Sequence, residues 1–329
     1  MIYSVIIPVY NRPDEVDELL ESLTRQPYGL FEVVVVEDGS TVPCQSVVDK
    51  YTDRLNLSYF TKPNSGPGQT RNYGAQRSRG DYLIFLDSDC IIPQGYFEAI
   101  EEELNTQPAD AFGGPDRAHQ SFTHTQKAIN YSMTSFFTTG GIRGGKKKMD
   151  KFYPRSFNMG IRKEAFDALN GFSTMRFGED IDLSIRIFEA GYSCRLFPKA
   201  WVYHKRRTDF RKFFRQVYNS GIARINLYKK YPQSLKLVHL LPAAFTVGIF
   251  LLLVAGICCP AFLFLILFYA LVVTADATIQ NKSLAIGLLS VVAAFVQLTG
   301  YGLGFLSAWW QRYVLGRNEF TAFTRNFYK

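Results

Sequence analysis

The stretch GDYLIFLDSDC, residues 80–90, decides the fold prediction. Its apolar run at residues 82–86 is typical of a short buried strand. Two carboxylates, Asp87 and Asp89, follow at its C-terminal end. Residues two apart on an extended chain point to the same side, so these acids repel each other unless a positive charge lies between them. A divalent metal on a diphosphate would supply that charge, because Mg²⁺ completes its shell with water and phosphate oxygens. The alternative is a solvated corner after the strand.

Further strands are predicted at residues 4–8, 31–36 and 57–60, with helical segments between them. A loop is predicted at residues 65–69 and a helix from Thr70 to Arg77. This alternation predicts βαβ units and a parallel sheet with flanking helices, an α/β fold. Three strand ends carry ligand-type residues, and in a parallel sheet they share one edge: Tyr10-Asn11, Glu37-Asp38 and Asp87–Asp89. Open α/β sheets bind ligands at that edge.

Composition narrows the class of protein. The 329 residues are 47% hydrophobic and 15% aromatic, which excludes a disordered chain. The five Cys form no CxxC pair and share no ligand spacing with the four His, so neither a disulfide framework nor a zinc site is indicated, and a reducing compartment fits. No signal peptide is visible after Met1.

Four motifs together resemble a known family: VIIPVYN at residues 5–11, EDGS at 37–40, GQTRN at 68–72 and DSD at 87–89. Their order and spacing, over about the first 205 residues, are similar to the inverting family 2 glycosyltransferases of GT-A fold. The resemblance implies a Rossmann-like, mostly parallel sheet. It also implies a nucleotide-sugar donor with Mg²⁺ or Mn²⁺ on its diphosphate.

The resemblance also implies roles for single residues. Donor contacts are expected from Pro8, Tyr10, Glu37, Asp38, Arg71, Asp87 and Ser88. Among these, Pro8, Tyr10 and Asp38 would contact the nucleobase with support from Arg71, and Asp87 would lie near the ribose or donor sugar. Glu37 departs from the usual Asp. Asp89 would ligate the metal, and His204 after a strand at 201–204 is a second candidate for the metal or diphosphate. The alternatives are that Pro8 ends a strand, Asn11 caps a helix, Arg71 is exposed and His204 is structural.

The acceptor side is expected around residues 155–182. An inverting transfer is a single displacement, so one carboxylate must take the proton of the acceptor hydroxyl. The family places this base in a Glu-Asp pair that maps onto Glu179-Asp180, at a predicted helix start. We expect Asp180 to be the base and Glu179 to orient the acceptor. Alternatively Glu179 only faces the helix dipole, and Asp182 pairs with Arg186 one turn on.

Residues 140–148 combine glycines with Lys146–Lys148 and predict either a solvated loop or a lid or acceptor loop that attracts a phosphate-bearing or membrane-bound acceptor. Residues 199–230 hold ten Lys/Arg and one acid, with aromatic residues at helical spacing. We expect a basic interfacial helix at 207–236 rather than a nucleic-acid binder, because an apolar tail follows at once.

The tail predicts about three transmembrane helices within residues 237–310, near 237–258, 261–279 and 283–310, and then a basic tail at 311–329. A soluble helical domain is the alternative. Three spans would put the tail outside the cell, yet its cations favour the inside, so either one segment is re-entrant or the positive-inside tendency is overridden. The tail cations are Arg312, Arg317, Arg325 and Lys329.

The expected protein is therefore a glycosyltransferase domain at residues 1–206 anchored on the cytosolic side of the inner (cytoplasmic) membrane. It would move one sugar from a nucleoside-diphosphate sugar, with UDP preferred, to a lipid-linked or glycan acceptor in surface polysaccharide assembly. No Gln-x-x-Arg-Trp motif of processive synthases is present. Transfer to polyprenyl phosphate and a catalytically silent nucleotide-sugar-binding subunit are the alternatives.

Overall fold

The computed structural model describes residues 1–27, 29, 31–117, 119, 121–140 and 152–318. The chain forms two compact units. We call Met1–His119 with Met149–Lys205 the α/β unit, and Gln120–Lys148 with Arg206–Lys329 the helical unit. Within the expected first domain, residues 1–206, the described residues 121–140 group with the C-terminal helices instead. The expected lid at Lys146–Lys148 lies outside the described residues.

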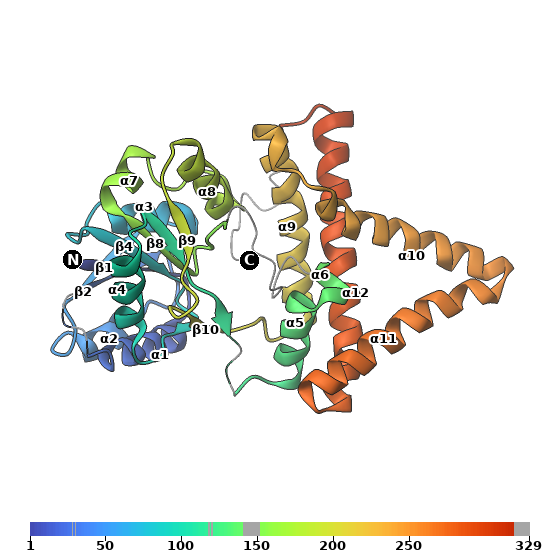
Figure 1. Cartoon of the computed structure of the whole chain (residues 1–329), viewed down its shortest axis with the longest axis horizontal. Coiled ribbons are helices and arrows are strands. Elements are labelled where there is room, and N and C mark those ends of the chain that lie inside the picture. Colours follow the sequence, from blue (N-terminus) through green and yellow to red (C-terminus); the bar gives the residue numbers. More distant parts are fainter. Residues whose placement is uncertain (28, 30, 118, 120, 141–151, 319–329) are drawn as a thin grey trace. The chain divides into compact units, whose positions relative to one another are not determined.

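The α/β unit is built on a seven-stranded sheet with the order β3-β2-β1-β4-β8-β6-β9 (Figure 1). The strands are β1 (Tyr3–Val9), β2 (Phe31–Asp38), β3 (Leu57–Lys62), β4 (Tyr82–Leu86), β6 (Ala111–Gly113), β8 (Asn158–Arg162) and β9 (Cys194–Leu196). β1 to β4 run parallel, and β8 runs antiparallel to β4 and β6. The predicted parallel α/β sheet is confirmed.

The sheet is covered on both faces because successive side chains of each strand alternate. In β1, Val5 and Ile7 pack on one side with α1 (Pro13–Thr24), α2 (Gln45–Val48) and α4 (Tyr96–Thr106). Ile6 packs on the other side with a second group of helices. These are α3 (Pro67–Ala75), α7 (Lys163–Ala168) and α8 (Glu179–Glu189). Both clusters are fully apolar at their centres, and this burial fixes the strand register.

Helix α3 begins earlier than expected. We predicted its start at Thr70, whereas the helix begins at Pro67. Proline suits the first turn of a helix because its missing N–H has no intrahelical partner there. Gly66 precedes it with φ +90°, a conformation that glycine adopts without strain.

A second, three-stranded sheet lies beside the strand ends. It consists of β5 (Cys90–Ile91), β10 (Val202–His204) and β7 (Asp116–Arg117), with β10 in the middle. β10 runs antiparallel to β5 and pairs His204 with Cys90. This register brings His204 next to Asp89, 115 residues away in sequence.

The helical unit contains two long packed helices and an apolar hairpin. The helices are α5 (His124–Thr134), α6 (Phe136–Thr139), α9 (Phe210–Lys230), α10 (Leu241–Cys258), α11 (Leu263–Asn281) and α12 (Leu284–Trp309). Among the described residues, three segments are long and apolar enough to cross a membrane: Leu237–Cys258, Pro260–Asn281 and Leu284–Val314. Asp209 caps α9 by accepting a hydrogen bond from the Lys212 backbone N–H.

Candidate active site

The predicted acids meet at the C-terminal edge of the parallel strands. Asp87 directly follows β4, and Glu37 and Asp38 end β2. Glu179 and Asp180 open α8, on the face of the sheet that α3 also covers. Arg71 of α3 connects these elements.

Arg71 is the central cation of the site. It is 2% exposed, and its two terminal nitrogens bind different carboxylates. Nη2 lies 2.6 Å from Asp87 Oδ1, and Nη1 lies 3.2 Å from Glu179 Oε1. The guanidinium also lies 5.4 Å from the centre of the Phe172 ring. The alternative of an exposed Arg71 is wrong: the side chain is buried and ties the end of β4 to the start of α8.

Glu179 has a perturbed pKa. Burial is the largest cause, followed by the charge of Asp180, and together they raise the pKa of Glu179 to about 7 despite the opposing charge of Arg71. Because Glu179 also pairs with Arg71, it has a tertiary contact in addition to its position in the first turn of α8.

Asp180 is held in place by two contacts. Its Oδ1 accepts a hydrogen bond from the Ile181 backbone N–H at 2.8 Å, and its Oδ2 lies 3.2 Å from Arg155 Nε. The side chain retains 12% exposure. By contrast, Asp182 is fully buried and pairs with Arg186 at 2.9 Å, as the structural alternative predicted.

Asp89 and His204 lie next to each other at the candidate site. His204 Nε2 lies 3.1 Å from Asp89 Oδ1, and the His204 ring stacks on Phe157. Cys90 also offers an atom within 4.8 Å of both. Its thiol donates to the Phe157 carbonyl, and burial raises the Cys90 pKa well above its usual value, so it stays neutral and is a poor ligand.

The donor set fits a divalent cation that is shared with a diphosphate. One carboxylate and one imidazole leave several coordination positions for phosphate oxygens and water, as Mg²⁺ and Mn²⁺ require. The other oxygen of Asp89, Oδ2, pairs with Arg12 Nη1. Asp89 thus lies between the guanidinium of Arg12 and the imidazole of His204, and its side chain is 7% exposed.

The two acids at the end of β2 are enclosed by protein donors. Asp38 is 1% exposed; its carboxylate accepts from the backbone N–H groups of Ser65 and Gly66, both at 2.9 Å, and pairs with Lys62. Glu37 accepts from the Cys44 backbone N–H at 2.8 Å and from the Tyr59 hydroxyl at 3.0 Å. These acids fix the loops that follow β2 and β3.

The remaining predicted donor residues lie at the same edge. Pro8 lies opposite Val36 of β2. The pairing of β1 with β4 ends at Ile6, so Pro8, which has no N–H to donate, lies beyond the β1–β4 pairing. Tyr10 follows β1 and is half-buried, and Ser88 is 5% exposed.

Asn11 does not cap α1, contrary to the alternative weighed from the sequence. Arg12 occupies the N-cap position of α1, without a side-chain cap bond. Asn11 adopts φ +53°, and its side-chain oxygen accepts from the backbone N–H groups of Thr41 and Val42. It therefore joins the loops that follow β1 and β2.

Two basic residues of the site were not predicted. Arg12 pairs with Asp89 across 77 positions, and Arg155 pairs with Asp180. Arg12 lies directly after the first motif, so its sequence position was a usable signal. Arg155 opens the range 155–182 that was expected to form the acceptor side, but only the tertiary fold specifies its pairing with Asp180.

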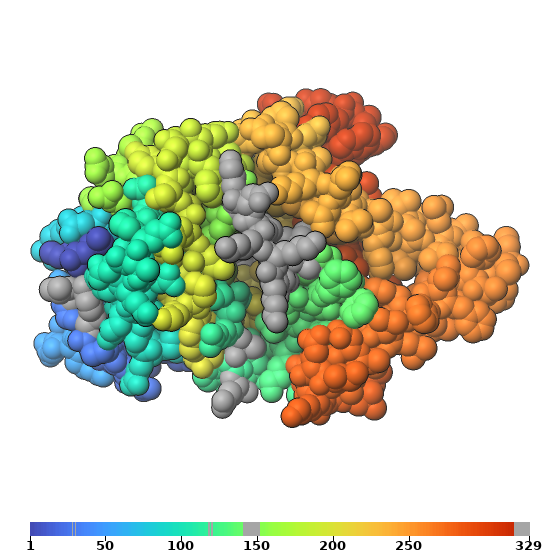
Figure 2. Space-filling model, in the orientation of Figure 1, coloured from blue at the N-terminus to red at the C-terminus, as the bar shows by residue number. Residues whose placement is uncertain are grey.

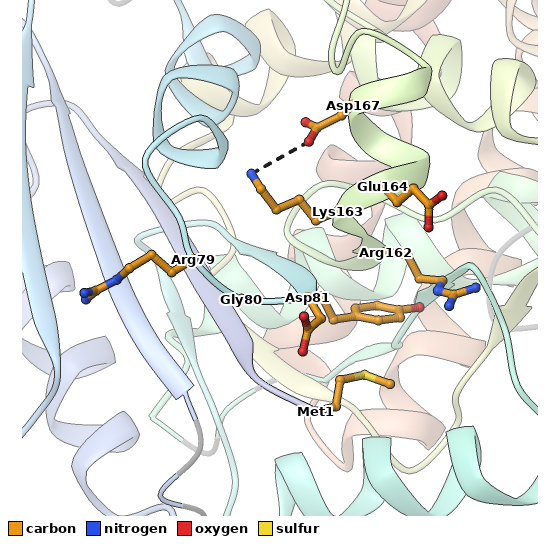
Figure 3. A pocket seen from close by; sticks show the side chains of 9 residues that line it. Met1, Arg79, Gly80, Asp81, Arg162, Lys163, Glu164 and Asp167 are labelled. Carbon is orange, nitrogen blue, oxygen red and sulfur yellow. Dashed lines mark ion pairs between the residues drawn. The ribbon is translucent and has the colours of Figure 1, made fainter.

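A surface depression lies elsewhere on the α/β unit (Figure 3). It has a volume of about 730 Å³, and its lining includes Met1, Asp81 and Tyr82 at the N-terminal ends of β1 and β4. Lys163 points towards Asp167 across it, at 3.9 Å. β4 begins at Tyr82 and has five residues, so the depression is roughly 17 Å from Asp87. It is not the site of the strand-end acids.

Comparisons with known proteins support a glycosyltransferase. An uncharacterized glycosyltransferase of Haemophilus influenzae is 30% identical over 194 residues, which are 56% of this chain and 62% of the relative. The poly(ribitol-phosphate) beta-N-acetylglucosaminyltransferase TarS of Staphylococcus aureus is 43% identical over 96 residues, 28% of this chain and 17% of TarS. The chain thus spans less than two thirds of the length of these curated relatives.

A solved structure shares the fold. The mannosyltransferase PcManGT from Pyrobaculum calidifontis, in complex with GDP-Man and Mn²⁺, superposes with a TM-score of 0.63 at 18% identity and covers 88% of this chain and 86% of its own. The family model for glycosyl transferase family 2 matches residues 4–169, half of the chain. The protein belongs to glycosyl transferase family 2.

Proposed function

We propose that this protein is a membrane-associated, metal-dependent inverting glycosyltransferase. It transfers one sugar from a nucleoside-diphosphate sugar to a lipid-linked glycan during assembly of a surface polysaccharide. A UDP-sugar is the preferred donor. Support comes from a solved complex of TarS with UDP-GlcNAc, at 22% identity, and from the GDP-Man complex of PcManGT, which keeps GDP-sugars as the second choice. The catalytic domain would face the cytosol at the inner membrane.

The observation that carries the proposal is the arrangement of two acidic groups at one sheet edge. Asp89 and His204 form the first group, suited to the cation on a donor diphosphate. Glu179 and Asp180 form the second, suited to an acceptor hydroxyl. Arg71 pairs with Glu179 of the second group and with Asp87, which precedes Asp89 of the first group by two residues in the chain. A displacement requires these two functions side by side, because donor and acceptor meet at one carbon.

The chemistry assigns each group a task. The acceptor oxygen attacks the anomeric carbon from the face opposite the diphosphate, and the bond from that carbon to the diphosphate oxygen breaks. The acceptor proton passes to the carboxylate of Asp180, which Arg155 and the Ile181 N–H hold in position. Asp89 and His204 would hold the divalent cation. When bound, that cation neutralises charge on the departing diphosphate.

The acceptor class follows from the helical unit. Three apolar helices at the C-terminal end favour an acceptor that is itself held in a membrane. Transfer of a labelled sugar to polyprenyl phosphate itself would show that this lipid, and not a lipid-linked glycan, is the acceptor.

The test is donor turnover by the full chain in membranes. UDP- and GDP-sugars are offered with and without Mn²⁺, and release of the nucleotide and binding of the donor are both measured. We expect release from one sugar only when Mn²⁺ is present, and loss of that release in Asp89→Asn. Asp53→Asn is the matched control, because Asp53 is an exposed acid on a loop of the same unit.

Each outcome has a defined meaning. Binding without release, with every acceptor preparation, would support a silent nucleotide-sugar-binding subunit instead. Equal metal-dependent release by Asp89→Asn and wild type would show that Asp89 is not a metal ligand. No metal-dependent binding of any donor would contradict the metal-dependent part of the proposal.

A further inference from the structure

Helix α12 is apolar enough to cross a membrane, but it is already covered by other helices. Its share of buried residues is 39%, against 6% for the segment that contains α10 and 11% for the one that contains α11. Ala128 and Ile129 of α5 pack with Ile286 and Ala293 in its first half. Helix α9 covers its second half.

The contact between α9 and α12 is made by their backbones. A Cβ atom added to Gly221 of α9 would lie 2.2 Å from the Tyr301 carbonyl oxygen, and one added to Gly304 would lie 2.0 Å from the Tyr218 carbonyl oxygen. Only glycine permits such an approach. This helix pair is therefore a fixed element of the helical unit, and neither helix can be placed in a membrane without the other.

The register shows that the two helices run parallel. Val217 faces Gly300, Tyr218 faces Gly304, and the Tyr228 ring lies 6.1 Å from the Tyr313 ring. The cations of α9 therefore accompany α12 from about residue 294 to residue 313. They are Arg211, Lys212, Arg215, Arg224, Lys229 and Lys230.

This charge distribution excludes α12 as a span while its contacts persist. Twenty helical residues rise about 30 Å, which is the whole thickness of the hydrocarbon core. Residues 284–293 of α12, which lie before the cations of α9, rise only about 15 Å. A spanning α12 would draw several Arg and Lys of α9 into lipid, each at about 2.5–3.5 kcal/mol at the centre of the bilayer.

The α10–α11 hairpin has the opposite character. No Lys, Arg, Asp or Glu occurs between Lys236 and Asp276. Large apolar side chains are exposed along it, such as Phe250 at 64%, Phe264 at 70% and Ile257 at 83%. Figure 1 shows α10 and α11 meeting at their tip and reaching α12 at separate places, and Figure 2 shows their orange surface standing out from that helix.

The free part of the hairpin is about one leaflet deep. Thr246 of α10 still contacts α12 through the Leu298 carbonyl, and Tyr269 of α11 donates to the Phe137 carbonyl. Beyond them lie residues 247–258 and 263–268. They rise about 18 Å and about 9 Å, against about 15 Å for half of the hydrocarbon core. The tip, residues 256–262, reads GICCPAF and offers no charged group for the far headgroups.

We propose that the α10–α11 hairpin enters the lipid from one side and turns back near the middle of the bilayer, while α12 stays outside the hydrocarbon core. The exposed apolar surface of the hairpin then contacts the acyl chains of one leaflet. The C-terminal end of α12 shares a compartment with the α/β unit, which removes the conflict between three spans and the cations of the tail. This inference rests on the membrane association in the proposed function.

The chain carries its own probes for the test. Cys258 and Cys259 are exposed at the tip, whereas Cys44 and Cys90 are buried. The full chain is expressed in a bacterial host, and spheroplasts are treated with a membrane-impermeant maleimide before or after lysis. Asn318→Cys reports the end of α12, and Asp53→Cys reports the α/β unit, both in a Cys258→Ser/Cys259→Ser background. Both positions are exposed.

We expect Asn318→Cys and Asp53→Cys to be protected in intact spheroplasts and labelled after lysis. The wild-type tip cysteines should stay unlabelled in both conditions and react only after denaturation in detergent. Labelling of Asn318→Cys from outside, with Asp53→Cys protected, would overturn the inference by showing that α12 crosses. Labelling of the tip from outside would overturn it by showing two full spans. Release of the chain from membranes by carbonate would instead contradict the membrane association itself.

Discussion

Replacing Arg71 with methionine tests the central ion-pair network. The change keeps most of the length of the side chain and removes the charge that faces Asp87 and Glu179. Breaking a buried ion pair costs about 3–5 kcal/mol when the remaining charge has no partner. Asp87 is 32% exposed, so water takes over part of its solvation. Glu179 is 11% exposed and has no such compensation.

The expected loss depends on pH because Glu179 can take up a proton. Burial has already raised its pKa to about 7, and removal of Arg71 raises it further. At pH 7.5 the wild-type glutamate is largely ionised, so Arg71→Met should lower the free energy of unfolding of the α/β unit by about 2–3 kcal/mol, about 1 kcal/mol of it from the proton that Glu179 must then take up. At pH 5.5 it is protonated in both proteins, and only hydrogen bonds and the Asp87 pair are lost, about 1–2 kcal/mol.

The assay is urea unfolding of the full chain in detergent micelles, followed by reaction of the buried thiols Cys44 and Cys90 with a soluble thiol reagent. Both lie in the α/β unit, so they report its unfolding. Arg77→Met is the matched control: Arg77 is exposed just after the same helix, and its loss should cost under about 1 kcal/mol. Adding Glu179→Gln to Arg71→Met should abolish the difference between the two pH values. An equal loss at both pH values, or a loss no larger than in the control, would refute the reasoning.

Three further predictions follow from the site and the sheet. The pKa of Glu179 rises from 4.5 in the unfolded chain to about 7, so the folded state binds the proton more tightly. The contribution of this group to stability is therefore full below pH 4.5 and falls by about 3 kcal/mol as the pH rises through 7. Urea titrations of Glu179→Gln should lack this pH dependence. Asp180→Asn should lower transfer about 10²–10⁴-fold and leave the donor Kd unchanged in equilibrium binding, and normal turnover would exclude Asp180 as the base. Gly160→Ala should lower the free energy of unfolding by about 1–3 kcal/mol, because its Cβ would lie 2.1 Å from the Phe112 ring; an unchanged urea midpoint would contradict that packing.

The sequence predicted much of the site because strand signals are local. The run at residues 82–86 is β4 to the residue, since its five apolar side chains are all buried and bounded by polar neighbours. The parallel order then placed Asp87 at the same edge as Glu37 and Asp38, because the carboxyl ends of parallel strands meet there. The i to i+4 pair of Asp182 and Arg186 was predictable for the same reason: helix geometry brings them together.

Other features were decided by the tertiary structure alone. Arg71 and Glu179 are 108 positions apart, and nothing in either local pattern specifies that they meet. The partnership of Arg155 with Asp180 and the burial of Glu37 and Asp38 likewise depend on how helices and loops close over the sheet. In the helical unit, composition alone predicted three similar apolar helices. Packing separated them, because Gly221 and Gly304 let a cationic helix lie against α12 and leave only the hairpin uncovered. Hydrophobic periodicity depends on near neighbours, whereas burial and charge pairing depend on residues that only the folded chain brings together.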